Sequence, residues 1–484
     1  MSAPSTDSVR LPTGSVTQPI ESGPKATRII VGLAFAGIVV SLMQSLVIPL
    51  IPQLPTLLSA SASDTAWAVT VTLLAGAVAT PTVGRLGDMF GKRRMLLFSI
   101  VLLVAGSVIA ALSSTLVPFI VGRALQGLAA GVVPLGISIL RDELPREKLG
   151  GATAMMSASL GVGGALGLPL AALIAQYANW HVLFWVAAAL GVVSFAIVMT
   201  VVPESRVRTG GRFDLLGAIG ISAALVLLLL AVSKGAQWGW GSALTVGMLM
   251  AAVIVFVLWA IWERRTPAPL VDLRIAARRQ VLLTNAASLV FGFALFAMSL
   301  VLPQLLQAPE STGYGLGQSM LVVGLVMAPS GLVMMAVAPV SARISAAAGP
   351  KVSLMVGAGV VAVGYGLNIV LMSATWQLVM VSMVIGAGIG IAYGAMPALV
   401  MGAVPRSETA AANSLNTLMR SVGTSVSSAV AGVVLAQMVV SIGNESVPSQ
   451  DGFRVVMALA AGAAVIALVI ASFLPRREAA ASGV

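Results

Sequence analysis

The sequence has no cysteine and only one histidine among its 484 residues. It therefore forms no disulfide, uses no thiol chemistry and lacks the ligands of an ordinary zinc site. No Gly-x-x-x-x-Gly-Lys-Ser/Thr stretch is present, so the chain has no phosphate-binding loop for ATP. Charged residues make up only 9% of the chain, too few to cover the surface of a soluble protein of this length. We expect no metal and no cofactor.

Apolar residues account for 58% of the chain, and runs of about 20 of them recur along its whole length. A run of this length crosses the hydrocarbon layer as a helix, so we expect the lipid bilayer to be the solvent of most of the chain. The pattern predicts fourteen spans, at residues 29–51, 67–84, 95–113, 116–140, 151–176, 181–202, 214–233, 243–262, 281–306, 318–340, 352–373, 376–402, 411–440 and 453–474.

Lysine and arginine are distributed unevenly between the predicted loops. If the amino terminus lies inside, 23 of the 27 basic residues fall in cytoplasmic loops and tails, and only Lys234 and Arg454 lie outside. The other two, Arg123 and Arg420, fall within spans. Because basic residues are retained on the cytoplasmic side, this predicts a multi-pass protein of the cell membrane with both termini cytoplasmic. The net charge of +11 is then a topology signal, and no nucleic-acid partner is expected.

The chain contains a weak internal repeat. A basic loop follows the second span, and a related loop follows the tenth. When Gly91 is aligned with Gly349, Arg93 falls over Lys351. Such repeats are typical of secondary transporters, which bind substrate between the two halves near the middle of the membrane. The predicted organisation is a disordered cytoplasmic tail at 1–27, a six-helix bundle at 28–203, two inserted helices with cytoplasmic loops at 204–279, a second six-helix bundle at 280–475, and a tail at 476–484.

Several motifs resemble those of a known family. Gly84-x-Leu-x-Asp88-x-x-Gly91-Lys-Arg is similar to the loop signature of the major facilitator superfamily, and Arg123-Ala-Leu-Gln126-Gly127 resembles its fourth-helix motif. Within that superfamily the chain resembles the fourteen-helix drug:proton antiporter family in its span number and in three further features: Trp180 with Phe184, the stretch 213–217 and the stretch 269–273. The resemblance covers about residues 28–475. It implies an all-α integral membrane protein with the major facilitator fold, two pseudo-symmetric bundles and two inserted helices.

The resemblance also implies a conformational latch at the first loop signature. There Asp88 would contact Arg141 and the start of span 13, holding the inner gate closed until the transporter switches. Gly84 and Gly91 would permit a sharp turn between two helix ends, and Arg93 belongs to the same signature. The alternative is a plain basic loop that only fixes topology.

Two arginines lie within predicted spans, where a charge is expensive and by default indicates function. Asn413, Asn416 and Arg420 are spaced so that they form one polar stripe on a helix. Two facing arginines would suit an anionic or hydrogen-bonding substrate. The alternative for each arginine is that its side chain extends to the nearest membrane surface. The predicted substrate pathway consists of Met43, Gln44, Ser45, Arg123, Gln126, Gln304, Gln307, Asn413, Asn416 and Arg420.

Proton coupling is less well supported than the resemblance suggests. Relatives often carry an aspartate in the first span, whereas Met43 takes that place here, and all sixteen acidic residues fall in tails, loops or helix ends. The remaining candidates are Asp64, His181 and Asp214, each of which could instead have a purely structural role.

The fifth span resembles the antiporter signature but departs from it at its end, where Leu168, Ala171 and Ala172 stand. Gly163, Gly167 and Pro169 remain, and they predict close packing of this span on a partner helix together with a kink.

Together these features predict an alternating-access exporter of small amphipathic or drug-like molecules, driven by proton exchange and active as a monomer. An importer or uniporter of a metabolite is the alternative within the class. A channel, and a membrane-embedded scaffold or enzyme, are alternatives from other classes. We expect no enzyme, because no acid pair and no nucleophile with a base is evident. The sequence identifies neither the substrate nor the coupling ion.

Overall fold

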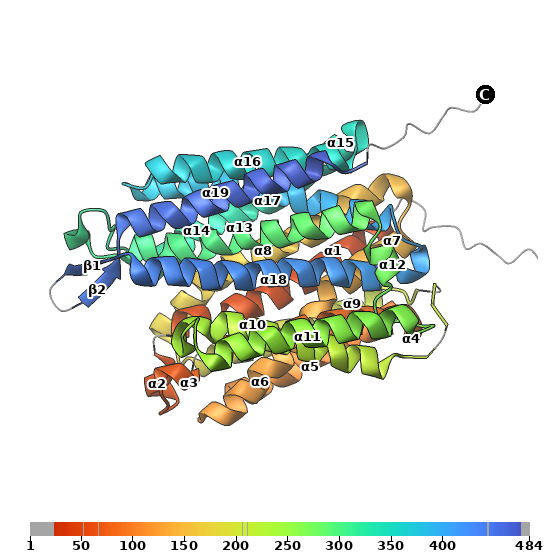
Figure 1. Cartoon of the computed structure of the whole chain (residues 1–484), viewed down its shortest axis with the longest axis horizontal. Coiled ribbons are helices and arrows are strands. Elements are labelled where there is room, and N and C mark those ends of the chain that lie inside the picture. The colour runs from red at the N-terminus through yellow and green to blue at the C-terminus, as the bar shows by residue number, and fades with distance from the viewer. Residues whose placement is uncertain are drawn as a thin grey trace, which may run out of the picture.

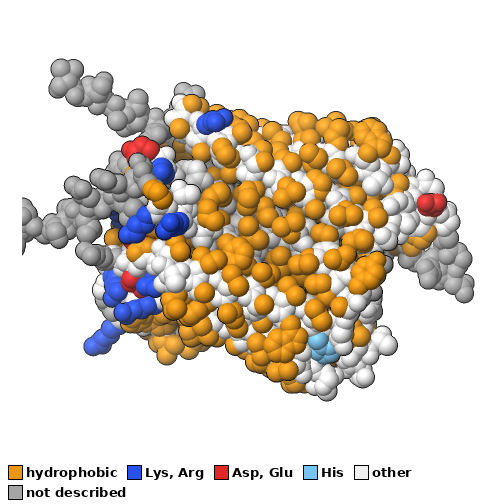
Figure 2. Space-filling view, turned by 180° about the vertical axis from the view of Figure 1, so that it is seen from behind, with side chains coloured by type: hydrophobic (Ala, Val, Ile, Leu, Met, Phe, Trp, Pro, Cys, Tyr) orange, Lys and Arg blue, Asp and Glu red, His pale blue; other side chains and the backbone are white. Residues whose placement is uncertain are grey.

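The computed structural model describes residues 24–51, 53–65, 67–205, 207–210, 212–442 and 445–475. Within these ranges, fourteen helical segments are long and apolar enough to cross a membrane, which confirms the predicted number. The long helices run side by side along one axis (Figure 1). Hydrophobic side chains cover the middle of the molecule, and lysines and arginines gather at one end (Figure 2), which we call the basic end. Most of the predicted tails, 1–23 and 476–484, lie outside the described residues.

The amino-terminal half contains the first six spans, and its buried apolar residues form one core. Its elements are α1 Pro24–Ser45, η1 Ile48–Leu50, α2 Leu54–Leu57, α3 Ala62–Thr65, α4 Trp67–Phe90, α5 Lys92–Leu112, α6 Leu116–Leu128, η2 Ala129–Gly131, α7 Val132–Glu143, α8 Arg146–Tyr177 and α9 His181–Val201. The segments α6, η2 and α7 together form the fourth span.

The carboxy-terminal half contains the last six spans around a second core. Its elements are α13 Arg279–Gln307, η3 Glu310–Thr312, α14 Met320–Ala336, α15 Ala338–Ala348, α16 Pro350–Val370, α17 Thr375–Met401, η4 Arg406–Glu408, α18 Thr409–Gln437, β1 Val439–Ile442, β2 Glu445–Pro448 and α19 Gln450–Ser472. The two strands form an antiparallel hairpin in which Val439 is opposite Pro448.

Between the halves in sequence lie α10 Leu215–Trp238, α11 Ala243–Arg265 and the short α12 Leu273–Ala276. Figure 1 shows α10 and α11 side by side, and α10 also packs against α4 and α18. Only 17% of the most apolar stretch of α11 is buried in the protein. This apolar, exposed helix is suited to contact with lipid, in agreement with our interpretation that the two inserted helices stand outside the two bundles.

Two equivalent turns support the predicted repeat. Gly91 follows α4 with φ 118° and Gly349 follows α15 with φ 89°, a region that favours glycine in both cases. The Arg93 side chain donates to the carbonyl of Met199 near the end of α9, while Lys351 Nζ donates at 2.7 Å to carbonyls at the end of α19. The aligned bases therefore hold the last turn of the sixth helix of their own halves, where free carbonyls attract positive charge.

Several predicted helix ends are wrong. Spans 2, 7 and 10, predicted to end at residues 84, 233 and 340, continue to Phe90, Trp238 and Ala348. The first span ends at Ser45 and not at residue 51, because Pro49 has no N–H to donate to the carbonyl of Ser45, and the chain passes into the short η1 instead. Span 13 ends at Gln437, before the hairpin of β1 and β2, which the sequence reasoning did not foresee. Such a hairpin is hard to predict, because each strand is only four residues long and shows too short an alternation of apolar and polar residues.

Candidate functional site

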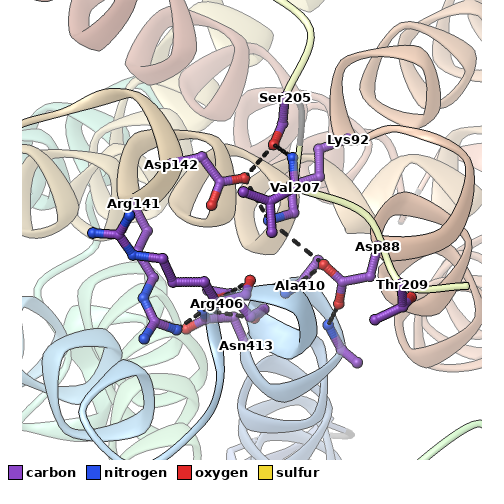
Figure 3. A network of polar contacts seen from close by, with 12 residues as sticks. Asp88, Lys92, Arg141, Asp142, Ser205, Val207, Thr209, Arg406, Ala410 and Asn413 are labelled. Atoms are coloured by element: carbon purple, nitrogen blue, oxygen red, sulfur yellow. Dashed lines mark hydrogen bonds and ion pairs between the residues drawn. The ribbon is translucent and has the colours of Figure 1, made fainter. Parts of the chain in front are cut away.

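Asp88 lies in the last turn of α4, at the basic end, and is fully buried. Its Oδ1 accepts a hydrogen bond from the backbone N–H of Ala410 at 3.3 Å, and its Oδ2 accepts one from that of Ala411 at 2.9 Å (Figure 3). Both donors lie in the first turn of α18, where free N–H groups and the helix dipole favour a negative charge. A carboxylate of the amino-terminal half thus caps a helix of the carboxy-terminal half.

Lys92 adds a buried positive charge beside this cap. Its Nζ lies 3.6 Å from Asp88 Oδ1 and 2.6 Å from Asp142 Oδ2, and the Lys92 side chain is inaccessible to solvent. Ser205 Oγ also donates to Asp142 Oδ2. A buried charge of this kind is tolerated only when it is paired, and removal of one partner is costly. The sequence reasoning missed Lys92 and Asp142 as site residues, although Lys92 stands four residues after Asp88 on what could be one helix face.

Arg141 does not form the expected ion pair with Asp88. Its Nη1 donates to Thr409 Oγ1 at 2.6 Å, and its Nη2 donates to the carbonyl of Val404 at 3.0 Å. Among the described ion pairs, the partner of Asp88 is Lys92. Asp88 and Arg141 nevertheless bind the same segment. Asp88 accepts from the N–H groups of α18, and Arg141 donates to the carbonyls that precede this helix.

Gly84 does not form the sharp turn that we expected, because α4 continues through it to Phe90. A Cβ placed on Gly84 would lie 2.2 Å from Ser414 Oγ and 2.9 Å from the carbonyl oxygen of Ala410. Gly84 therefore permits the close approach of α4 and α18, and Gly91 alone makes the turn. Arg93 also differs from the expected latch, because its contacts lie within its own half, at α9 and at Glu204.

Gly84→Val should separate α4 from α18, because a branched side chain has no space between the two helices. Overpacking of this kind costs about 1–3 kcal/mol, so we expect transport to fall by roughly tenfold or more. Gly359→Val is the matched control, since nothing lies within 4 Å of a Cβ at that helical glycine. Transport and thermal unfolding of both variants in membranes would check this, and wild-type transport by Gly84→Val would contradict it.

Arg123 is only 1% exposed, so its side chain does not extend to the membrane surface. Its Nε donates to the carbonyl of Ala68 at 3.3 Å, and its Nη1 donates to the carbonyl of Met43 at 3.2 Å and to Gln126 Oε1 at 2.7 Å. Gln126 in turn donates to Ser107 Oγ at 2.8 Å. Arg123 and Gln126 thus form an internal cross-link that joins α6 to α1, α4 and α5.

Most other predicted pathway residues are also engaged within their own half. Asn416 donates to Asn285 Oδ1 and Ser288 Oγ of α13 at 2.9 and 2.7 Å. Asn413 donates to the Thr409 carbonyl of its own helix, and Ser45 Oγ to that of Leu42. Gln44 and Gln307 are exposed, whereas Met43 is buried and Gln304 is partly exposed.

Arg420 differs from Arg123, the other charged residue of the predicted pathway. Its guanidinium carbon lies 4.8 Å from the centre of the Tyr393 ring, and the described structure gives its side chain no hydrogen bond and no ion pair. Within the predicted stripe, Arg420 therefore carries a charge that no hydrogen-bond acceptor or carboxylate of the described structure pairs with.

α8 packs between α1 and α14. A Cβ on Gly163 would lie 2.4 Å from the Ile38 carbonyl oxygen, and one on Gly167 would lie 1.9 Å from Ser45 Oγ, so both glycines face α1. Pro169 stays inside the helix and meets Gly324 of α14, in the other half. The small residues of the fifth span thus let one helix contact both halves closely.

The three candidates for proton coupling lie at helix ends and are not in contact with one another in the described structure. His181 Nε2 lies 3.1 Å from the Ser113 carbonyl oxygen, and its ring stacks on Trp180. Asp64 is exposed and accepts a hydrogen bond from Ser61. Asp214 caps α10 by accepting from the Gly217 N–H at 2.9 Å and is held by the Trp262 indole, which gives it a structural role.

Glu263, near the end of α11, is a buried carboxylate that the sequence reasoning did not single out. It is 3% exposed, and neither of its oxygens receives a hydrogen bond of good geometry. The amides of Leu270 and Val271 and the Trp259 indole lie close to it. Glu263 Oε1 and Asp214 Oδ2 would both lie under 3 Å from a Cβ on Gly217, so the two acids are neighbours.

Comparison with known proteins adds a family to this geometry. The family model described as the Major Facilitator Superfamily matches residues 33–428. An uncharacterized transporter of this type from Mycobacterium tuberculosis is 28% identical over 423 residues, which is 86% of this chain and 60% of the relative. The chain thus spans less than two thirds of the length of that protein.

Two further proteins are similar over most of the chain. The tetracenomycin C resistance and export protein of Streptomyces glaucescens is 27% identical over 416 residues, 85% of this chain and 76% of the relative. Among solved structures, a human organic anion transporter superposes with a TM-score of 0.67 over 93% of this chain and 100% of the other, at 14% identity. At that identity the likeness shows the fold alone.

Proposed function

Since this chain belongs to the major facilitator superfamily, we propose that it is a secondary active transporter that exports small amphipathic or drug-like molecules by alternating access. The observation that carries this proposal is the polar contact at the basic end, where Asp88 of one half caps α18 of the other. The similarity to a resistance and export protein favours export over import. An importer or uniporter remains the alternative.

Alternating access needs a closure that can open. The contact between Asp88, Arg141 and the start of α18 consists of hydrogen bonds between two halves whose apolar cores are largely separate, so it can break without unfolding either half. Rocking of the two halves would then open the basic end and close the opposite one, with the substrate site between them.

We also propose that the basic end faces the cytoplasm and that the resting structure is closed on that side. Support comes from the positive-inside rule, since lysines and arginines gather at that end (Figure 2). Both termini would then be cytoplasmic, and export would carry substrate toward the end of the molecule that holds the β1–β2 hairpin.

Proton exchange is the proposed driving force. In everted membrane vesicles, uptake of two xanthene dyes, fluorescein and rhodamine 123, would be measured by filtration and lysis at a fixed pH. We expect saturable uptake of at least one dye when the vesicle interior is acidic, and loss of this uptake when nigericin collapses the pH gradient. Uptake that needs an alkaline interior would indicate import with protons, uptake that ignores the gradient would indicate a uniporter, and flux without saturation would indicate a channel.

A further inference from the structure

Arg420 lies in the middle of α18, which packs against α13 of its own half and against α4 of the other half, and its side chain keeps partial accessibility. Within the described structure its guanidinium forms no hydrogen bond and no ion pair, and it lies over the face of the Tyr393 ring, at 4.8 Å from the ring centre. A guanidinium has five N–H donors, and in hydrocarbon an unpaired one is expensive. The ring face stabilises part of this charge. The described structure shows no hydrogen bond from Arg420 to the Tyr393 hydroxyl oxygen.

Tyr393 of α17 is a second unsatisfied group at the same place. It is 1% exposed, and its hydroxyl has no hydrogen-bond partner. Its ring also packs edge-on against Phe291, with ring centres 6.3 Å apart. Arg420 and Tyr393 thus present a cation and a hydroxyl donor next to aromatic surface.

The other intramembrane arginine, Arg123, does have hydrogen-bond partners for its guanidinium. Arg123 is held by two backbone carbonyls and by Gln126. No carboxylate pairs with Arg420 in the described structure, where the acidic residues lie in loops or near helix ends. Arg420 therefore has donors to spare and no counter-ion from the protein.

The backbone holds Arg420 in place. A Cβ on Gly292 of α13 would lie 2.1 Å from the Arg420 carbonyl oxygen, and one on Gly423 would lie 1.8 Å from the carbonyl oxygen of Leu289. α13 and α18 are therefore in backbone contact at Arg420 itself and again about one turn later, at Gly423. Such rigid support is what a binding group needs if it is to bind without reorganising first.

We propose that Arg420 and Tyr393 bind the anionic group of the transported molecule, so that the substrates are amphipathic organic anions. This inference rests on the proposed function and narrows its substrate class. A carboxylate or phenolate would accept hydrogen bonds from the guanidinium and from the Tyr393 hydroxyl. An aromatic or apolar remainder would pack against the neighbouring rings, and a cationic drug would meet repulsion from Arg420.

The test compares fluorescein, an anion, with rhodamine 123, a cation on the same xanthene ring system. Binding to the purified full chain would be followed by fluorescence anisotropy, and transport by uptake into everted vesicles. We expect the wild type to prefer fluorescein. Loss of charge-assisted hydrogen bonds should raise its Kd about 10- to 100-fold in Arg420→Gln, while Arg420→Lys recovers part of the loss. Tyr393→Phe, which removes only the hydroxyl, should raise it about tenfold or less.

Arg454→Gln is the matched control, because Arg454 is an exposed arginine paired with Asp451 at the start of α19. This variant should bind both dyes as the wild type does. Preference of the wild type for rhodamine 123, or an unchanged fluorescein Kd in a folded Arg420→Gln protein, would overturn the anion site while leaving export in place. Fluorescein binding that depends on Arg420, without any movement of dye across the membrane, would support the site and contradict the proposed transport function.

Discussion

Arg123→Ala should abolish transport and lower the thermal stability of the protein. The arginine is fully buried, and its three hydrogen bonds reach α1, α4 and Gln126 of its own helix. Truncation takes a donor from the Met43 carbonyl and from Gln126 Oε1 in a water-poor interior, at about 1–3 kcal/mol for each group left unsatisfied, and adds a cavity. The Ala68 carbonyl keeps the Thr72 hydroxyl as a donor. Since α1 and α4 are held at the same point, their positions relative to α6 should become poorly defined.

The measurements are dye uptake in everted vesicles and the unfolding temperature in detergent. Arg123→Lys keeps the charge but offers fewer donors in a different geometry, so it should retain stability better than transport. Arg343→Ala, at an exposed arginine, is the control for loss of an arginine as such. Wild-type transport by Arg123→Ala would show that this internal cross-link is dispensable.

Asp88→Asn should impair transport by about tenfold or more while expression stays near normal. The two carboxylate oxygens each accept a hydrogen bond from an N–H of α18. In asparagine an NH₂ group replaces one of these oxygens, so it would face one of the backbone N–H groups without being able to accept from it. Hydrogen bonds to a charged group contribute about 1.5–3 kcal/mol, which corresponds to a roughly 10- to 100-fold shift toward the state open at the basic end. Lys92 keeps Asp142 as a partner, so the amino-terminal bundle should still fold.

The absence of cysteine makes this shift measurable, because one introduced thiol is a unique reporter. Ser414 is fully buried against Gly84. In Ser414→Cys, a membrane-impermeant maleimide should react slowly in everted vesicles, and about tenfold faster or more when Asp88→Asn is added. Asp451→Asn, at an exposed acid of the opposite end, should leave the rate unchanged. Equal rates with and without Asp88→Asn would exclude the latch, and reaction in intact cells but not in everted vesicles would reverse the proposed orientation.

The sequence predicted the latch signature but not its bonding. Asp88 was expected to meet Arg141 and the start of span 13, and the structure places it on the α18 amides while Arg141 reaches the carbonyls of the same segment. The direction of these two side chains depends on how α4, α7 and α18 meet, which no local pattern encodes. Gly84 shows the same limit, because a glycine that permits a turn and one that permits close packing look alike in a sequence.

The sequence by itself determined that the protein is embedded in a lipid bilayer, the number of its membrane-spanning helices, and their division into two related halves with two inserted helices. These properties follow from local hydrophobicity and from the spacing of repeated motifs, both of which are written along the chain. The tertiary structure alone decided which intramembrane arginine is satisfied. Arg123 and Arg420 are chemically identical, and only the carbonyls that neighbouring helices bring to the first, and do not bring to the second, make one a structural cross-link and leave the other free for an anion.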